Sequence, residues 1–480
     1  MSQDLSSKEN PIPTKATLGT AIPVTNLPAQ RGKIHIKEQK GHFQRLRTGL
    51  NSLLILFFFL LPFIPYQGRQ AILLDVERQE FHFFSLTLWP QDFTLLAWLF
   101  IIAAFGLFFV TVFWGRVWCG YLCPQTSWSF AFVWIERQIE GNSNKRHALD
   151  KAPWHLEKIL KRTAKHLAWG LAALVTGCGF IAYFIPANEL YGQIFTLSAS
   201  FWVSAWVWFF ALCTYLNAGW MREQMCLHCC PYARFQSAMF DANTLTVSYD
   251  AARGESRGPR KRKQATELGD CVDCNLCVDV CPTGIDIRNG LQYECINCGA
   301  CVDACDQTMD KFGYDKGLIR YASENELKQK QVKRFTSFKF VGYGIAVIIM
   351  LSVFALDLYR HQSIDLNVIR DRQSLYREVG DGRIENSYTL KIRNKTQEDH
   401  QYLIALADAA NHGIARQTKQ RVLIKAGEQL SYPVTVYEQK RAGFVGAKLQ
   451  KQTISFTVTN LSNPKEKVSQ ASPFFSLSAF

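Results

Sequence analysis

The stretch Cys271–Pro282 reads C-V-D-C-N-L-C-V-D-V-C-P and places four cysteines at the spacing C-x2-C-x2-C-x3-C-P. Thirteen residues separate the last cysteine of this run from Cys295–Cys305, which repeats the pattern as C-I-N-C-G-A-C-V-D-A-C. Three thiolates spaced two residues apart can bind three corners of a cubane iron–sulfur cluster, and the fourth cysteine of each run binds the other cluster. The two runs therefore predict a bacterial ferredoxin-like fold with two [4Fe-4S] clusters.

This exchange of the fourth cysteine defines two sets of ligands. The first cluster takes Cys271, Cys274, Cys277 and Cys305, and the second takes Cys281, Cys295, Cys298 and Cys301. The alternative is a pair of zinc knuckles, which also use C-x2-C pairs. Zinc sites normally combine two such pairs across a longer loop, without a third cysteine two residues later. The spacing therefore favours iron–sulfur clusters.

The composition excludes several classes of protein. The chain has 480 residues, too many for one simple core, and its 13% aromatic and 20% charged residues exclude a disordered or collagenous chain. Fifteen cysteines in so long a chain argue against a secreted disulfide scaffold. The net charge of +14 would suit nucleic-acid binding, a membrane surface or the loops of a membrane protein. The positions of the charges decide between these three.

Five apolar runs without Asp, Glu, Lys or Arg are long enough to be considered as membrane spans. They are Leu50–Tyr66, Phe93–Trp114, Leu167–Ala187, Phe195–Leu216 and Phe340–Leu356. The first and last contain 17 residues, the lower limit for a span, so a buried core helix is the alternative for these two.

Lys and Arg are concentrated in alternate loops. Residues 1–48 hold eight, 115–166 hold nine and 217–337 hold sixteen, whereas 67–92 hold two and 188–194 none. Because these residues accumulate in cytoplasmic loops, the pattern predicts a cytoplasmic N-terminus and a C-terminus outside. Met1–Asn26 has no hydrophobic region, so we expect no signal peptide. The positive charge then reflects topology, and no nucleic-acid partner is expected.

Two further cysteine motifs follow the second and fourth runs. The first, G-R-V-W-C-G-Y-L-C-P, contains Cys119 and Cys123, and the second, M-C-L-H-C-C-P, contains Cys226 and Cys230. Both read C-x3-C-P, and thiols four residues apart share one face of a helical turn. Two such pairs at one membrane depth could converge on a single site, and thiolates prefer soft ions, Cu(I) above all. The alternative is that these cysteines are only small apolar side chains.

Other residues near these motifs have a structural interpretation. Cys178 and Cys213 lie within spans and are expected to pack there, while Arg116 and Arg222 are expected to anchor span ends at lipid phosphates. The basic run Arg257–Lys263 is expected to attract anionic lipid.

The C-terminal part, from about Asp365, has no cysteine and no apolar run long enough to span a membrane. Its short alternating segments, separated by turn-rich pieces, are typical of an antiparallel β-sandwich. They are Ser387–Ile392, Tyr402–Ala407, Arg421–Ile424, Ser431–Tyr437 and Thr453–Val458. Nothing in this part indicates catalysis, so we expect it to dock a partner or to stabilise the protein.

The sequence thus predicts a multi-domain membrane protein. It combines a five-helix α transmembrane domain, a bacterial 2[4Fe-4S] ferredoxin-like insert and a C-terminal immunoglobulin-like β-sandwich. The expected domains are a cytoplasmic tail (1–48), four transmembrane helices with both CxxxCP motifs (49–240), the cytoplasmic insert (241–337), a fifth transmembrane helix (338–358) and a periplasmic sandwich (359–480).

This order of elements resembles the CcoG/FixG/RdxA family over roughly residues 30–480. These proteins assist assembly of the cbb-type cytochrome c oxidase in Proteobacteria and are implicated in reducing Cu(II) to Cu(I). The resemblance implies a cupric reductase of the bacterial inner membrane, with Cys119, Cys123, Cys226 and Cys230 as a copper and redox site beside the eight cluster ligands. It also implies four partners: the lipid bilayer, a cytoplasmic electron donor, a copper transporter or chaperone, and the oxidase assembly machinery.

Two other functions remain open from the sequence. Membrane polyferredoxins of the NapH and NosR types share the C-x3-C-P pairs and the ferredoxin motifs, so the chain could be a quinol-linked electron conduit without a copper role. A third reading is a scaffold whose clusters only sense redox state. The external sandwich favours the accessory protein, because a conduit does not require it.

Overall fold

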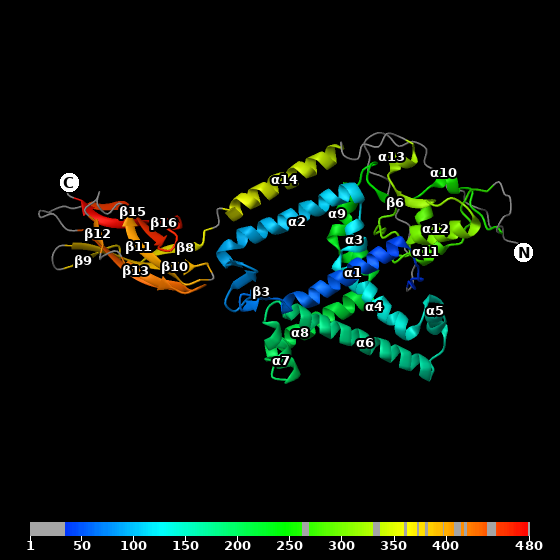
Figure 1. Ribbon diagram of the computed structural model, residues 1–480, viewed down its shortest axis with the longest axis horizontal. Helices are drawn as coiled ribbons and strands as arrows, with labels where there is room; N and C mark the ends of the chain where they lie inside the picture. The colour runs from blue at the N-terminus through cyan, green and yellow to red at the C-terminus, as the bar shows by residue number, and fades with distance from the viewer. Residues whose placement is uncertain are drawn as a thin grey trace, which may run out of the picture. The chain divides into compact units, whose positions relative to one another are not determined.

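The computed structural model describes residues 34–261, 268–329, 337–359, 362–371, 374–379, 383–396, 398–407, 414–416, 420–438 and 448–478. Met1–Asn26, where no signal peptide is expected, and the end of the basic run Arg257–Lys263 lie outside them. The chain forms two compact units, one of residues up to 81 and 90–354, and one of residues 82–89 and 355–480 (Figure 1).

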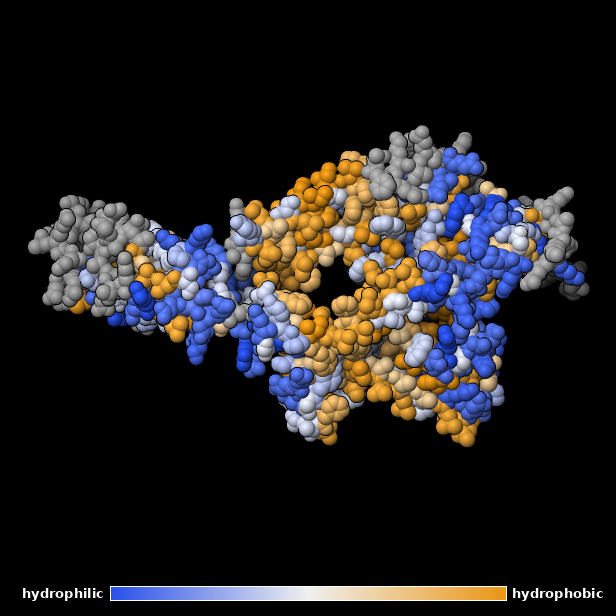
Figure 2. Space-filling view, in the orientation of Figure 1, coloured by the Kyte–Doolittle hydropathy of each residue, from blue (hydrophilic) through white to orange (hydrophobic). Residues whose placement is uncertain are grey.

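Among the described residues, five helices are long and apolar enough to cross a membrane, and they correspond to the five predicted spans. They are α1 (His42–Leu60) with the turn η1 (Leu61–Phe63), α2 (Phe93–Trp114), α6 (Leu156–Ile181), α8 (Phe201–Thr214) with the π-helix η3 (Tyr215–Met221), and α14 (Phe338–Tyr359). Figure 2 shows hydrophobic surface over α2 and α14. This surface is the expected consequence of side chains that face lipid.

Two of these helices begin earlier than the hydrophobic runs predicted. Helix α1 starts at His42, eight residues before Leu50, because the backbone N–H groups of Phe43 and Gln44 donate to the Asp303 carboxylate at 3.2 and 2.8 Å. An acidic group at a helix N-terminus satisfies its free N–H groups and its dipole. Helix α6 starts at Leu156, eleven residues before Leu167, and Lys158 and Lys165 within this added stretch are buried.

The fourth span is shorter at its start than predicted. Residues from Ala187 to Phe195 form a separate helix, α7, and α8 begins only at Phe201. The Ser200 side chain caps α8 by accepting a hydrogen bond from the N–H of Val203.

Both C-x3-C-P motifs end at the start of a helix. Pro124 is the first residue of α4 (Pro124–Glu140), and Pro231 is the first residue of α9 (Pro231–Met239). Proline suits this position because its missing N–H would have no helical partner there. The remaining elements at this end of the spans are α3 (Val117–Tyr121), α5 (Ser143–Lys151) and the π-helix η4 (Met225–Cys229).

The ferredoxin-like insert is built around one antiparallel strand pair, β6 (Thr246–Tyr249) with β7 (Ile319–Ala322). Each cysteine run leads into a helix, α11 (Leu276–Asp279) or α12 (Ala300–Phe312), as Figure 1 shows. Its smaller elements are α10 (Ala251–Gly254), η5 (Ile287–Asn289) and α13 (Glu324–Leu327).

Short strands lie between the first two spans. They form a pair, β1 (Pro65–Tyr66) with β2 (Arg69–Gln70), and a three-stranded sheet of β3 (Ile72–Asp75), β4 (Glu80–Phe83) and β5 (Leu86–Leu88), followed by the turn η2 (Pro90–Asp92).

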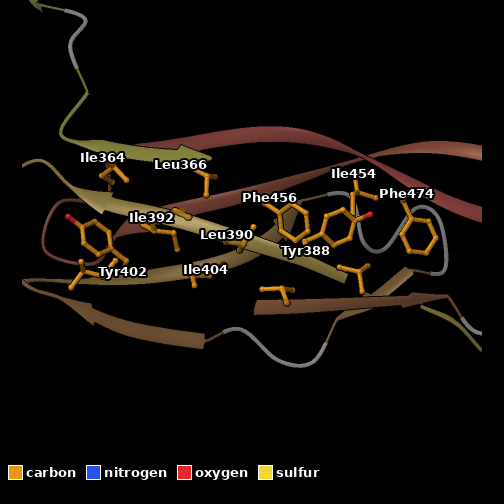
Figure 3. Close-up of a cluster of buried hydrophobic side chains, with 14 residues drawn as sticks. Ile364, Leu366, Tyr388, Leu390, Ile392, Tyr402, Ile404, Ile454, Phe456 and Phe474 are labelled. Atoms are coloured by element: carbon orange, nitrogen blue, oxygen red, sulfur yellow. The ribbon is translucent and has the colours of Figure 1, made fainter. Parts of the chain in front are cut away.

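The C-terminal part forms the predicted β-sandwich, and each of the five alternating segments lies within one of its strands. One sheet has the order β12-β14-β10-β8 with β9 beside β10, and the other the order β13-β11-β15-β16. The strands are β8 (Ile364–Arg370), β9 (Arg377–Val379), β10 (Arg383–Asn394), β11 (His400–Ala407), β12 (Ile414–Arg416), β13 (Gln420–Ile424), β14 (Gln429–Glu438), β15 (Lys448–Asn460) and β16 (Lys467–Ser478). Tyr388, Phe456 and Phe474 fill its core (Figure 3).

Candidate functional site

The eight cysteines of the ferredoxin-like insert line two adjacent cavities. Four thiols from both runs surround the first cavity, those of Cys271, Cys274, Cys277 and Cys305. The second cavity is lined by Cys281, Cys295, Cys298 and Cys301, and also by Cys277. The last cysteine of each run therefore lies with the first three cysteines of the other run.

These cavities suit the group that the sequence implies. Each offers four thiols around one small space, which matches the four iron corners of a cubane cluster. Burial raises the pKa of Cys277, Cys295 and Cys305 to about 12. Thiols in such surroundings stay neutral unless a metal compensates the thiolate charge, as binding to iron would.

A second group of thiols forms where the two C-x3-C-P motifs meet. The pKa of Cys119 is raised to about 12, mainly by burial and also by the nearby Cys123, Cys226 and Cys230. Burial, together with the nearby Cys123 and Cys230, likewise raises the pKa of Cys226 to about 12. The structure thus brings together the four membrane-edge thiols from two motifs more than a hundred residues apart.

The immediate surroundings of these thiols are polar as well as apolar. The thiol of Cys119 donates to Oε1 of the fully buried Gln236 at 3.3 Å, and Nε2 of Gln236 donates to Oγ1 of Thr111 at 3.3 Å. Within the described residues, no group of three or more His, Cys, Asp or Glu side chains is arranged to hold a single metal ion. Cys178 packs in the apolar core of α6, as expected from the sequence.

The first membrane-edge motif packs directly on the second cluster cavity. A Cβ added at Gly120 would lie 2.7 Å from the carbonyl oxygen of Ile296 and 3.0 Å from Cα of Cys298. The hydroxyl of Tyr121 donates to the carbonyl oxygen of Cys298 at 3.1 Å. Cys119 itself packs against the apolar cluster that contains Cys298. The two sets of thiols are therefore neighbours in space.

The arginine interpretation from the sequence is wrong at both positions. Arg116 is 3% exposed and donates to the carbonyl oxygens of Tyr293, at 2.5 Å, and of Ala233, so it joins the insert to α9. Arg222 is 8% exposed, and its Nη2 lies 2.5 Å from Oε2 of Glu136. Both guanidinium groups are bound within the protein and do not anchor span ends at lipid phosphates.

Arg222 belongs to a buried network of charges that sequence reasoning missed. The carboxylate of Glu136, which is fully buried, also lies 3.5 Å from Nη1 of Arg146 and 3.9 Å from Nζ of Lys165. Lys165 in turn lies 2.9 Å from the carboxylate of Glu140. The network ties α4, α5 and α6 to the segment that leads into the second C-x3-C-P motif. The sequence analysis counted the Lys and Arg residues of this network only as charges of cytoplasmic loops, so their pairing with buried carboxylates was missed.

Comparison with protein families agrees with this architecture. Residues 221–324 match a model described as a 4Fe-4S dicluster domain, and residues 96–137, which include Cys119 and Cys123, match a 4Fe-4S binding domain. Residues 354–476 match the IG-like fold at the C-terminus of FixG. The predicted iron–sulfur domain and the immunoglobulin-like domain are thereby confirmed.

Whole-chain relatives extend this result. The chain is 37% identical to nitrogen fixation protein FixG of Rhizobium meliloti, over 80% of this chain and 82% of that protein. It is 37% identical to protein RdxA of Cereibacter sphaeroides (80% and 84%) and 34% identical to protein RdxB of the same organism (91% and 95%). A crystal structure of a FixG-related protein from Vibrio parahaemolyticus is 29% identical over 24% of this chain and 98% of that chain, with a TM-score of 0.20. On the identity and coverage of its curated relatives, the chain belongs to the FixG/RdxA family of iron–sulfur redox proteins.

Proposed function

We propose that this protein passes single electrons from two [4Fe-4S] clusters to the four membrane-edge thiols, where Cu(II) is reduced to Cu(I) for assembly of a cbb-type cytochrome c oxidase. The first cluster is held by Cys271, Cys274, Cys277 and Cys305, and the second by Cys281, Cys295, Cys298 and Cys301. The observation that carries the proposal is the direct packing of Gly120 and Tyr121 on Cys298.

The cavities suggest an order for the electron path. Cys274 is exposed, so the first cavity is the one open to a soluble donor. Cys277 lines both cavities and joins them. The second cavity is the one that contacts the C-x3-C-P motif. The clusters supply reversible one-electron chemistry, and these residues set the order in which the electron passes.

Reduction of copper suits the chemistry of the membrane-edge site. The step consumes one electron per ion, Cu(II) becoming Cu(I), and thiolate ligands favour the softer reduced ion. Since burial raises the pKa values of Cys119 and Cys226, these thiols bind copper by releasing protons. Cu(I) then leaves to a transporter or chaperone.

The placement in the cell is part of the same proposal. The distribution of Lys and Arg supports an orientation with the N-terminus and the insert in the cytoplasm and the sandwich in the periplasm of a bacterial inner membrane. The domain boundaries given above remain predictions.

Replacing Cys119, Cys123, Cys226 and Cys230 together by alanine is expected to abolish Cu(II) reduction while both clusters remain. The measurement is anaerobic: dithionite-reduced protein receives Cu(II), and a Cu(I)-specific chelator reports the product. Cys178→Ala, which removes a packed thiol of α6, serves as the control and should react like the wild type. Equal Cu(I) formation by the fourfold variant would show that the clusters reduce copper nonspecifically. No reaction in the wild type would favour the electron conduit.

Gly120→Ala is expected to slow Cu(I) formation by about tenfold to a hundredfold, because small misplacements of reacting groups have effects of this size. The added methyl group collides with backbone atoms of Ile296 and Cys298 and must separate the motif from the second cavity. Gly106→Ala in α2 is the matched control, since nothing lies within 4 Å of the added atom there. Stopped-flow mixing measures the rate, and iron analysis verifies the clusters. An unchanged rate in Gly120→Ala would contradict the route.

A further inference from the structure

A cavity of about 500 Å3 lies between α1, α4 and the ferredoxin-like insert. Its volume falls within the range of pockets that bind small molecules, about 300–1,000 Å3. Nineteen residues line it, and none of them is a cysteine. The cavity is therefore separate from the two cluster cavities and from the membrane-edge thiols.

One wall of this cavity is shared with the second cluster cavity. Ala300 lines both spaces, and it precedes Cys301 in the chain. Val280, which precedes Cys281, lines the new cavity as well. A molecule in the cavity would thus lie next to the second cluster cavity, with Ala300 in the wall between them. This position favours a redox-active ligand.

The cavity also contains an arginine with a free donor. Arg47 is 4% exposed, its Nη1 has no hydrogen-bond partner, and its guanidinium lies 4.1 Å from the ring centre of Phe130. The Nη2 group donates to Oε1 of Gln44. A buried N–H without a partner is costly, so a ligand oxygen that accepts from it would be bound favourably.

The other cations that line the cavity have acidic partners. Arg137 lies 3.0 Å from Glu38, and Lys37 lies 3.5 Å from Asp279. Arg146 lies 3.5 Å from Glu136, and its buried Nε and Nη1, like Nη1 of Arg47, make no hydrogen bond. A phosphate headgroup would be expected to meet several uncompensated cations, whereas a neutral carbonyl oxygen needs only one free donor.

The cavity wall formed by α1 is polar near Arg47 and apolar at Ile55. Arg47 and Asn51 lie on the same face of the helix as Ile55, which is about 12 Å further along its axis. On α4, Phe130, Val133 and Trp134 line the cavity, and Trp134 is 57% exposed. A ligand with a carbonyl-bearing head and an apolar tail matches this gradient.

We propose that this cavity binds the headgroup of a membrane quinol or quinone, with Arg47 donating to a ring oxygen, and that the bound quinol supplies electrons to the second cluster. Oxidation of one quinol would release two protons to water and two electrons, one for each of the two clusters that the cysteines would hold. This inference rests on the proposed cluster assignment. It adds a membrane-soluble donor to the cytoplasmic donor expected from the sequence.

The test measures binding of ubiquinone-1 to the purified, oxidised, full-length protein by equilibrium dialysis in detergent. Arg47→Leu is expected to weaken binding by about tenfold or more, the effect of losing one charged hydrogen bond. Arg45→Leu is the matched control, because Arg45 is exposed on the same helix. Ile55→Trp, which fills the cavity, should also block binding, whereas Leu56→Trp, at an exposed position that does not line it, should not.

Unchanged binding in both Arg47→Leu and Ile55→Trp would overturn the quinone site. So would a phospholipid that copurifies with the wild type, is lost in Arg47→Leu and replaces any quinone binding. Iron and sulfide content of the same samples tests the proposed function separately. Wild-type protein without two clusters would overturn the cluster assignment, whereas intact clusters without quinone binding would overturn only the inference about this cavity.

Discussion

Replacing Cys305 by serine is expected to remove the first cluster and to leave the second in place, although Cys305 ends the second cysteine run. Its thiol lines the cavity formed by the first run, whereas Cys301, one helical turn earlier on α12, lines the other. Four residues advance a helix by about 6 Å. One helix therefore contributes ligands to two different clusters.

The expected loss is half of the iron and sulfide and one of two electron paramagnetic resonance signals in the reduced protein. Cys271→Ser identifies which signal belongs to the first cluster, and Cys305→Ser should match it. Conversely, Cys281→Ser should match Cys295→Ser. Cys213→Ser, outside both cavities, controls for the loss of a thiol alone. If Cys305→Ser instead matched Cys295→Ser, each run would hold its own cluster and the assignment would be wrong.

The buried charge network predicts the largest loss of stability. Glu136→Leu is expected to cost about 3–5 kcal/mol, the usual penalty for removing one partner of a buried ion pair. The substitution leaves Arg146, Lys165 and Arg222 without the carboxylate that they share. The midpoint of thermal unfolding in detergent, followed by tryptophan fluorescence, measures the effect.

An exposed ion pair provides the control for this prediction. Glu157 lies 2.5 Å from Lys161 on the surface of α6, and its side chain is 64% exposed. Since exposed pairs contribute only about 0–1 kcal/mol, Glu157→Gln should hardly move the midpoint. Glu136→Leu should also speed alkylation of Cys226, because Arg222 positions the segment before it. Equal midpoints for the two variants would show that the network does not stabilise the fold.

The features that the sequence predicted are those encoded by short-range spacing. The C-x2-C runs define a ferredoxin-like fold locally, and apolar runs identify the five spans without knowledge of their neighbours. Alternation of apolar and polar residues likewise located five of the nine described strands of the sandwich. The end of α2 was predicted to the residue because its apolar run stops at Trp114, and Gly115 has a positive φ of 57°.

The features that the sequence did not predict depend on contacts between distant segments. Arg47 was counted as a charge of a cytoplasmic tail, but α1 begins before it and buries it. Arg116 donates to the carbonyl oxygen of Tyr293, and Arg222 forms an ion pair with Glu136. Both partners are distant in the sequence, so no local pattern indicates these contacts. Glu136 lies on α4, and its partners Arg146, Lys165 and Arg222 come from three other segments of the chain.

The cap of α1 has a consequence for synthesis of the chain. The carboxylate that satisfies the first N–H groups of α1 belongs to Asp303, 260 residues later than Phe43. At a translation rate of about 5–20 residues per second, Asp303 leaves the ribosome roughly 13–50 s after the helix that it completes. Helix α1 must therefore enter the bilayer with its first N–H groups uncapped, and folding of the insert completes its first turn only afterwards.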